Sequence, residues 1–205
     1  MTVFCILLNL LQQQRQKQSD VSREDKLAMF LMKLKLGVSL TAVVTLFGVT
    51  KSRASRVFHI TLDQLSARMK EWIFVPPRKC IKENFPACFK ENYPGCAFII
   101  DCTEVKTKTP SDPEQQHYLY SHYKGGYTLK WLIGIIPNGM ISFLSKPYGG
   151  RYSDSFITRD SGFLEHVSPD LALSDKRFPQ ITTTIAEKRA GLFMSLFNTG
   201  GVSFL

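Results

Sequence analysis

The chain has 205 residues, a formal net charge of +9 and an isoelectric point near 9.4. Its hydrophobic content of 44%, with 15 Phe, excludes a globally disordered protein and provides enough apolar side chains for a core. The excess of Lys and Arg favours a polyanionic partner, and nucleic acid is the first candidate.

Residues 1–21 combine a short apolar run with a Gln-rich tract and match no recognisable motif, so we treat them as an N-terminal tail. The run from Val3 to Leu11 is shorter than the about 20 apolar residues that a membrane span needs. No basic residue precedes it and no small-residue cleavage site follows it. We therefore expect no membrane partner.

The cysteines do not have the spacing of a zinc site. Four of them, Cys80, Cys88, Cys96 and Cys102, lie near one another but lack the close pairs that hold zinc. An odd number of cysteines fits reduced thiols in the nucleus or cytoplasm, and a nucleic-acid partner favours the nucleus.

Three helices are predicted in residues 22–75, and capping residues mark their boundaries. Ser22, Ser39 and Thr50 are candidate N-caps, while Gly37 and Gly48 are expected to end the first two helices. The sharp turn at Gly48 predicts a small all-α helix-turn-helix domain.

The start of the third predicted helix is basic. In a helix-turn-helix these turns enter the major groove, where side chains contact phosphates and base edges. Helix pairs of this shape also occur as plain packing units, and that alternative stays open. The candidate DNA-binding residues here are Lys51, Ser52, Arg53 and Arg56.

The helical pattern continues to Phe74, and two prolines then mark a boundary. A packed connecting segment, residues 76–97, leads to a second domain, residues 98–205. In that domain we predict strands at 98–105, 127–136, 140–145 and 170–175, with a hairpin turn at 137–139. A helix follows Ser153 and is interrupted by Gly162.

Acidic residues stand at the ends of two predicted strands. Asp101 follows the apolar run of the first strand, and we expect this strand and its aspartate to be buried. Asp175 follows the apolar run of the fourth strand. If these strands are parallel neighbours, both aspartates reach the same sheet edge and can share a divalent metal ion. Alternatively, Asp101 caps a turn or pairs with a lysine. Glu104 lies three residues after Asp101, so on a strand its side chain points to the opposite face from that of Asp101. We therefore assign it a supporting role outside the set of metal ligands.

An aromatic cluster precedes Lys124. His117, Tyr118, Tyr120, His122 and Tyr123 could stack on bases while Lys124 contacts phosphate, or the rings could simply pack the rim of the sheet. Both interpretations stay open.

Several motifs occur in an order that identifies a family. The chain resembles the DDE-superfamily endonucleases of Harbinger-type transposons over most of residues 22–200. The segments that carry the resemblance are Phe85-Pro86 with Tyr93-Pro94, Ile99 to Glu104, Tyr120 to Lys124 with Thr128-Leu129-Lys130, Gly149-Gly150-Arg151-Tyr152-Ser153-Asp154, Ser161-Gly162-Phe163, and Leu173 to Phe178.

The resemblance implies an α/β fold with an RNase H-like mixed sheet and flanking helices. It also implies an acidic triad that binds two Mg²⁺ or Mn²⁺ ions for phosphodiester hydrolysis or strand transfer on DNA. Asp101 and Asp175 match the first two acids, as catalytic residues and metal ligands. Asp154 would support them from outside or cap its helix.

The third acid of the family follows a His-Val-Glu-Arg stretch that does not occur before Leu205, and Glu187 is not assigned to this role. We therefore expect the family domain to be truncated, and two hypotheses follow. The chain is a transposase-derived nuclease, inactive if the third acid is missing, or a non-catalytic DNA-binding protein.

A separate DNA-binding protein and a second copy of the chain are further expected partners. A third hypothesis is an interaction module that uses an exposed sheet edge.

Overall fold

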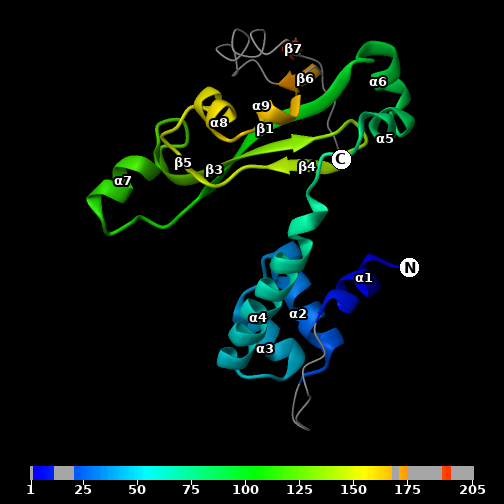
Figure 1. The fold of residues 1–205 in the computed structure, drawn as a ribbon. Helices are drawn as coiled ribbons and strands as arrows, with labels where there is room; N and C mark the ends of the chain where they lie inside the picture. The colour runs from blue at the N-terminus through cyan, green and yellow to red at the C-terminus, as the bar shows by residue number, and fades with distance from the viewer. Residues whose placement is uncertain (1, 12–20, 168–170, 175–190, 195–205) are drawn as a thin grey trace. The chain divides into compact units, whose positions relative to one another are not determined.

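The computed structural model describes residues 2–11, 21–167, 171–174 and 191–194 (Figure 1). The chain divides into two compact units, Met1–Trp72 and Ile73–Leu205, and each is described by itself. None of the helices in the described ranges is long and apolar enough to cross a membrane.

The first unit is entirely helical. Its helices are α1 (Val3–Leu10), α2 (Arg23–Leu36), α3 (Leu40–Phe47), α4 (Lys51–Met69) and the short 3₁₀ helix η1 (Lys70–Trp72).

The predicted caps of the first unit are confirmed. The hydroxyls of Ser22, Ser39 and Thr50 each accept a hydrogen bond from the backbone N–H three residues on. Gly37 and Gly48 end α2 and α3 with φ near +63° and +62°, a conformation that glycine adopts without a steric penalty. The turn between α3 and α4 therefore forms as the sequence predicts.

The end of α4 differs from the prediction. The regular helix stops at Met69, η1 adds one turn, and residues 73–74 are not helical. The apolar pattern is misleading here because Trp72, Ile73 and Phe74 are exposed rather than packed. Val75 also precedes a proline, which disfavours helical backbone at that position.

Helix α1 lies in the segment that the sequence suggested to be a tail. Two arginines satisfy carbonyl groups at its C-terminal end: Arg23 Nη2 donates to Leu8 O at 2.6 Å, and Arg68 Nη1 donates to Leu10 O. Apolar side chains of α1 and the residue that follows it, and of α2 and α4, form one buried cluster: Leu7, Leu11, Leu27, Phe30 and Leu65.

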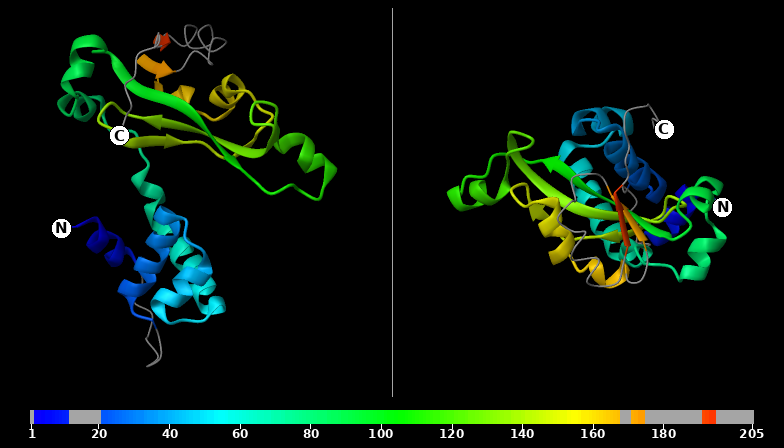
Figure 2. Two further views of the ribbon diagram at one scale, coloured as in Figure 1. Left: turned by 180° about the vertical axis from the view of Figure 1, so that it is seen from behind. Right: turned by 90° about the horizontal axis from the view of Figure 1, so that it is seen from above.

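The second unit is built on a mixed sheet. Its main strands are β1 (Cys96–Lys106), β3 (Gly126–Ile135), β4 (Ile141–Leu144), β6 (Leu171–Ser174) and β7 (Gly191–Met194), with the short β2 (Tyr120–Ser121) and β5 (Tyr148–Gly149). The order is β2-β3-β1-β6-β7, and β4 and β5 also pair with β3. Strand β1 runs antiparallel to β3 and parallel to β6, which is parallel to β7. Figure 2 shows this sheet from two further sides.

Short helices flank the sheet: α5 (Arg78–Glu83), α6 (Ala87–Asn92), α7 (Pro113–Leu119), α8 (Asp154–Asp160) and α9 (Leu164–Val167). Gly162, with φ near +79°, separates α8 from α9, as predicted. The predicted hairpin between β3 and β4 is also present. The predicted fold class, an α/β mixed sheet with flanking helices after a helical domain, is confirmed.

Three phenylalanines form the centre of the core in the second unit. Phe163 packs with its ring centroid 5.3 Å from that of Phe98 and 5.1 Å from that of Phe143. Gly134 makes room for them, since an added Cβ would lie 3.0 Å from Phe143 Cβ. The core thus joins β1, β3 and β4 to the segment between α8 and α9, and this holds the C-terminal end of α8 beside the sheet.

Candidate active site

Strands β1 and β6 are parallel neighbours, which is the arrangement required for a shared site at their ends. Their register pairs Ile99 with Leu173 and Ile100 with Ser174. The residue after Ile100 is Asp101, and the residue after Ser174 is Asp175, which lies outside the described residues.

The predicted burial of Asp101 is wrong. Strand β1 is buried up to Ile100, but Asp101 is exposed, and partly buried positions then alternate with exposed ones to Val105. The change occurs where the described pairing with β6 ends, so the strand continues with β3 as its described neighbour. Asp101 Oδ1 accepts a hydrogen bond from the backbone N–H of Cys102 at 2.8 Å.

A cavity of about 500 Å³ opens beside Asp101. Strand β1, the turn between β2 and β3, strand β3 and the start of α8 contribute its walls. Of the predicted site residues, it brings together Asp101, Glu104, Lys124 and Asp154. The full lining is Asp101, Cys102, Glu104, Tyr123, Lys124, Lys130, Ser153 and Asp154. We call it the Asp101 cavity.

Lys130 connects the sheet to helix α8 across this cavity. Its Nζ lies 3.2 Å from Asp154 Oδ1 and donates to Tyr152 O at 3.1 Å. Both charged side chains are largely buried, at 11% and 19% exposure. Asp154 does not cap α8, because the Ser153 hydroxyl accepts from Phe156 N and fills that role. The lysine therefore compensates the Asp154 carboxylate.

Glu104 is also engaged. Thr128, which is fully buried on β3, donates from Oγ1 to Glu104 Oε1 at 2.6 Å. Gly150 leaves the room for this contact: an added Cβ would lie 2.0 Å from Thr128 Oγ1 and 2.8 Å from Leu119 O. Gly149 is equally confined, with Tyr118 O at 2.1 Å from its Cβ position. The two glycines of this motif thus permit close approach of backbone to backbone.

Thr128 and Lys130 lie in the segments that resemble the family, but the sequence predicts no role for them. Their positions on the predicted strand could have pointed to them, because Thr128 and Lys130 alternate in step with Leu132 and therefore share its strand face. That face is the buried one, and a lysine on a buried face requires a partner. The partners themselves lie 24 residues away in each case and depend on the strand register.

Cys102 lies between these groups. Burial raises the pKa of its thiol far above the ordinary value, and the charge and hydrogen bond of Asp154 raise it further, although Lys130 acts in the opposite direction. The thiol is therefore neutral at physiological pH. Like the other four cysteines, it is not part of a disulfide.

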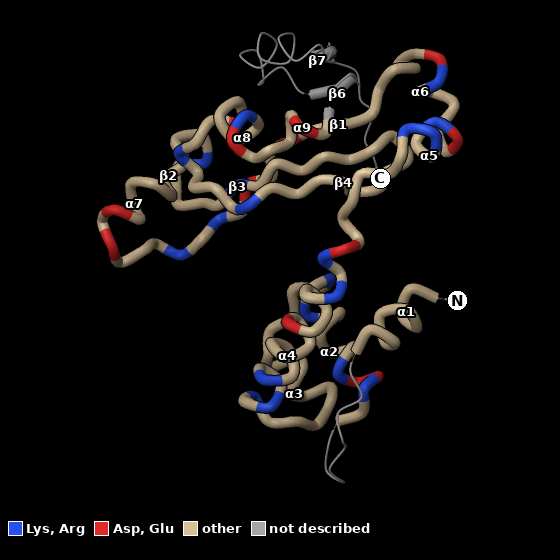
Figure 3. The backbone as a smooth tube through the Cα atoms, in the orientation of Figure 1, with Lys and Arg blue, Asp and Glu red and all other residues tan. Residues whose placement is uncertain are grey.

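In the helical unit, α4 presents two distinct faces at its start. Lys51, Ser52 and Arg56 are exposed, and Arg53 is partly buried. Ala54 and the next turn of the helix pack inward against α2 and α3 in a second buried cluster: Met29, Val43, Ala54 and Val57. Figure 3 marks the Lys and Arg positions along the backbone.

Comparison with protein-family models gives two matches. Residues 19–71 match the helix-turn-helix of DDE superfamily endonuclease, and residues 100–195 match DDE superfamily endonuclease. The two segments lie in the expected order and together cover more than half of the chain. The chain belongs to the DDE endonuclease superfamily. Neither the curated proteins nor the solved structures yield a match.

The chain is therefore a DDE superfamily endonuclease of the transposase-derived type, in which a helix-turn-helix precedes the nuclease domain. DDE superfamily nucleases generally use divalent metal ions, so the carboxylates can be tested for their fit to such ions. Asp101 fits, as an exposed hard-oxygen donor beside a cavity. Glu104 and Asp154 fit less well, because Thr128 and Lys130 already engage them.

Within the described part of this DDE endonuclease, no group of three or more His, Cys, Asp or Glu side chains could hold a metal ion. Asp175, the second ligand that the sequence predicts, lies outside the described residues.

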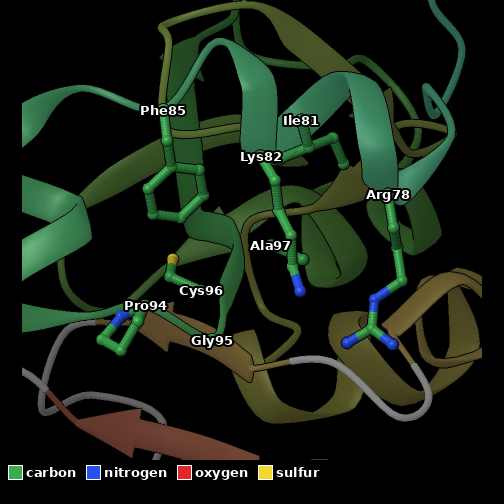
Figure 4. A pocket seen from close by; sticks show the side chains of 8 residues that line it. All are labelled: Arg78, Ile81, Lys82, Phe85, Pro94, Gly95, Cys96 and Ala97. Atoms are coloured by element: carbon green, nitrogen blue, oxygen red, sulfur yellow. The ribbon is translucent and has the colours of Figure 1, made fainter.

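A smaller cavity lies at the other end of β1, against helix α5 (Figure 4). Arg78 and Lys82 project from α5 beside the chain at Gly95, and Phe85 and Cys96 line the apolar part. Its volume is about 40 Å³, and its lining includes none of the predicted site residues. Of these two cavities, the Asp101 cavity is the one that predicted site residues line.

Proposed function

We propose that this DDE superfamily endonuclease is of the Harbinger type and cleaves or joins DNA with Mg²⁺ or Mn²⁺ held by Asp101 and Asp175. The pairing of Ile100 with Ser174 carries this proposal. Parallel neighbouring strands deliver their next residues to the same edge of a sheet, and in both strands that residue is an aspartate.

When bound there, divalent ions would activate water or a 3′-hydroxyl and stabilise the leaving oxygen of the phosphodiester. The residues of the chain contribute the surroundings. Lys124 is exposed at the mouth of the Asp101 cavity and can attract a DNA phosphate. Lys130 compensates Asp154, which lowers the repulsion that the wall of the cavity would otherwise exert on phosphate.

The helix-turn-helix would hold duplex DNA. The exposed Lys51, Ser52 and Arg56 at the start of α4 suit the major groove, and Arg53 lies beside them. A DNA substrate also leads us to propose the nucleus as the location. A separate DNA-binding protein and self-association stay predictions.

The test is a calorimetric titration of Mn²⁺ into the full chain. Binding with a Kd below about 1 mM is expected, and it should be lost in the double variant Asp101→Asn, Asp175→Asn. Glu165→Gln is the matched control, because it removes an exposed carboxylate on α9 and should leave binding intact. Equal Mn²⁺ binding in all three proteins would refute the assignment of the two aspartates.

Nicking of supercoiled plasmid with Mn²⁺ completes the test. Loss of nicking in the double variant but not in Glu165→Gln would support a nuclease. Plasmid binding without nicking by the unmodified chain fits two cases, which the Mn²⁺ titration separates. Mn²⁺ binding that is lost in the double variant would indicate a nuclease inactive for lack of the third acid, and no Mn²⁺ binding would favour the second hypothesis, a transposon-derived DNA-binding protein without catalysis.

A further inference from the structure

We propose that a second cavity, beside helix α7, binds one unpaired nucleotide of the DNA substrate, with its base against tyrosine and histidine rings and its phosphate on Arg151. This inference rests on the proposed function, because it names the part of the DNA that the nuclease unit would hold near the cut.

The cavity has the size and the chemistry for such a ligand. Its volume is about 340 Å³, within the range of small-molecule sites. Aromatic, basic and amide side chains meet in it: Gln116, His117, Tyr120, His122, Tyr127 and Arg151. We call it the Tyr120 cavity.

Most of its rings are open to solvent rather than part of a buried packing layer. The ring of Tyr120 lies 5.3 Å from that of His122 and 5.7 Å from that of Tyr127, and both contacts are edge-to-face. Rings that only packed the rim of the sheet would be covered, but Tyr120, His117 and His122 are exposed. Exposed aromatic faces beside positive charge are the usual way to hold single-stranded bases without sequence preference.

Hydrogen bonds orient the polar side chains that line the Tyr120 cavity. Gln116 Nε2 donates to Pro110 O at 2.8 Å, which leaves the amide oxygen to accept from the Tyr127 hydroxyl at 3.4 Å. The Arg151 guanidinium contacts the ring of His117, with Nη1 2.8 Å from Nδ1. A guanidinium has five donors in a planar fork, so Arg151 can keep this contact and still bind a phosphate.

The position of the cavity connects it to the Asp101 cavity. The turn between β2 and β3 carries His122 toward the Tyr120 cavity and the next residues, Tyr123 and Lys124, toward the Asp101 cavity. The segment after β5 is shared in the same way, since Arg151 lines one cavity and Ser153 the other. A DNA strand with its phosphate at Asp101 would therefore have a neighbouring nucleotide at the Tyr120 cavity once that nucleotide leaves the duplex.

The experiment compares two DNA hairpins in EDTA with the full chain. One is blunt, and the other carries a three-nucleotide single-stranded extension with 2-aminopurine. We expect the extension to tighten binding roughly tenfold and to quench the 2-aminopurine fluorescence by ring stacking. Tyr120→Leu, which keeps apolar bulk but removes the ring, and Arg151→Gln should each abolish most of this gain while leaving the affinity for the blunt hairpin unchanged.

Arg159→Gln is the matched control for charge, because Arg159 is exposed on α8 and lines neither cavity. An extension gain that survives in both Tyr120→Leu and Arg151→Gln would overturn the inference, as would a gain lost equally in Arg159→Gln. The readout needs no metal, so it is independent of the Mn²⁺ titration. Extension binding without Mn²⁺ binding would remove the nuclease proposal alone, and Mn²⁺ binding without an extension gain would remove the nucleotide site alone.

Discussion

Lys130 and Asp154 form an ion pair whose Nζ and Oδ1 atoms lie 3.2 Å apart, between strand β3 and the first turn of α8. Lys146 and Asp160 form another at 3.0 Å, but there the side chains are 65% and 43% exposed. These two ion pairs have nearly the same N–O distance, but only the Lys130–Asp154 pair is largely buried.

Replacement of Lys130 by Met should destabilise the protein strongly. The change leaves the Asp154 carboxylate and the Tyr152 carbonyl without this partner in a largely buried setting, and breaking such a pair costs about 3–5 kcal/mol. Lys146→Met is the matched control, and its cost should be much smaller because water screens that pair. Urea unfolding followed by circular dichroism measures both free energies.

The double variant Lys130→Met, Asp154→Leu separates the ion pair from the shape of the lysine side chain. Because both charges are then absent, the double variant should be less destabilised than the sum of the two single variants. Additive losses would show that Lys130 acts by packing alone.

Gly150→Ala should disrupt the wall of the Asp101 cavity. The added Cβ would overlap Thr128 Oγ1 and approach Leu119 O to 2.8 Å, and a backbone carbonyl cannot move aside as the end of a flexible side chain can. We expect a loss of about 3 kcal/mol or more in the free energy of unfolding. Gly126→Ala is the control, since its Cβ meets nothing within 4 Å. Similar thermal melting curves for the two variants would contradict this account.

Arg56→Gln should weaken duplex binding without altering the fold. If Arg56 contacts one phosphate, the slope of log K against log salt concentration should become shallower by about 0.9. Lys70→Gln is matched in charge and lies at the far end of the α4 region, roughly 20 Å away along the helix axis, so it should not change the slope. Fluorescence anisotropy over a salt series measures the slopes, and equal slopes would exclude Arg56 from the interface.

Asp160 provides a test of pH dependence. The Tyr148 hydroxyl donates to Asp160 Oδ2 at 2.8 Å, and this hydrogen bond, with Lys146 nearby, lowers the pKa of the carboxyl below its ordinary 3.8. The stability that the carboxylate adds is therefore fully present above pH 3.8 and is lost as the pH falls through the lower folded-state pKa. In Tyr148→Phe the pKa should rise toward 3.8, as measured by carbon NMR of the carboxyl. An unchanged pKa would assign the shift to Lys146.

Local signals in the sequence were sufficient for much of the fold. Ser22 and Thr50 cap their helices through hydrogen bonds to residues three positions on, and Gly48 and Gly162 adopt positive φ where a helix must end or break. These interactions span only a few residues, so the sequence pattern contains all the participants. The parallel pairing of the first and fourth predicted strands was only a condition of the shared site, and the pairing of β1 with β6 meets it.

The interior of the site could not be predicted in the same way. The partners of Glu104 and Lys130 depend on the register between β1 and β3 and on where α8 begins, which no short pattern specifies. The burial of Asp101 was overestimated because its apolar run does not reveal where a neighbouring strand ends. The confinement of Gly150 likewise depends on Leu119, a residue far away along the chain.

Helix α1 makes the cooperative unit of the first domain larger than the family segment that it contains. The family match begins at residue 19, yet Leu7 and Leu11 cover Leu27 and Leu65, and arginines from α2 and α4 donate to the end of α1. A fragment cut at the family boundary would leave these leucines in contact with water and the arginine donors without their carbonyls. Insolubility of such a fragment would reflect the missing α1 and would not count against DNA binding by the intact domain.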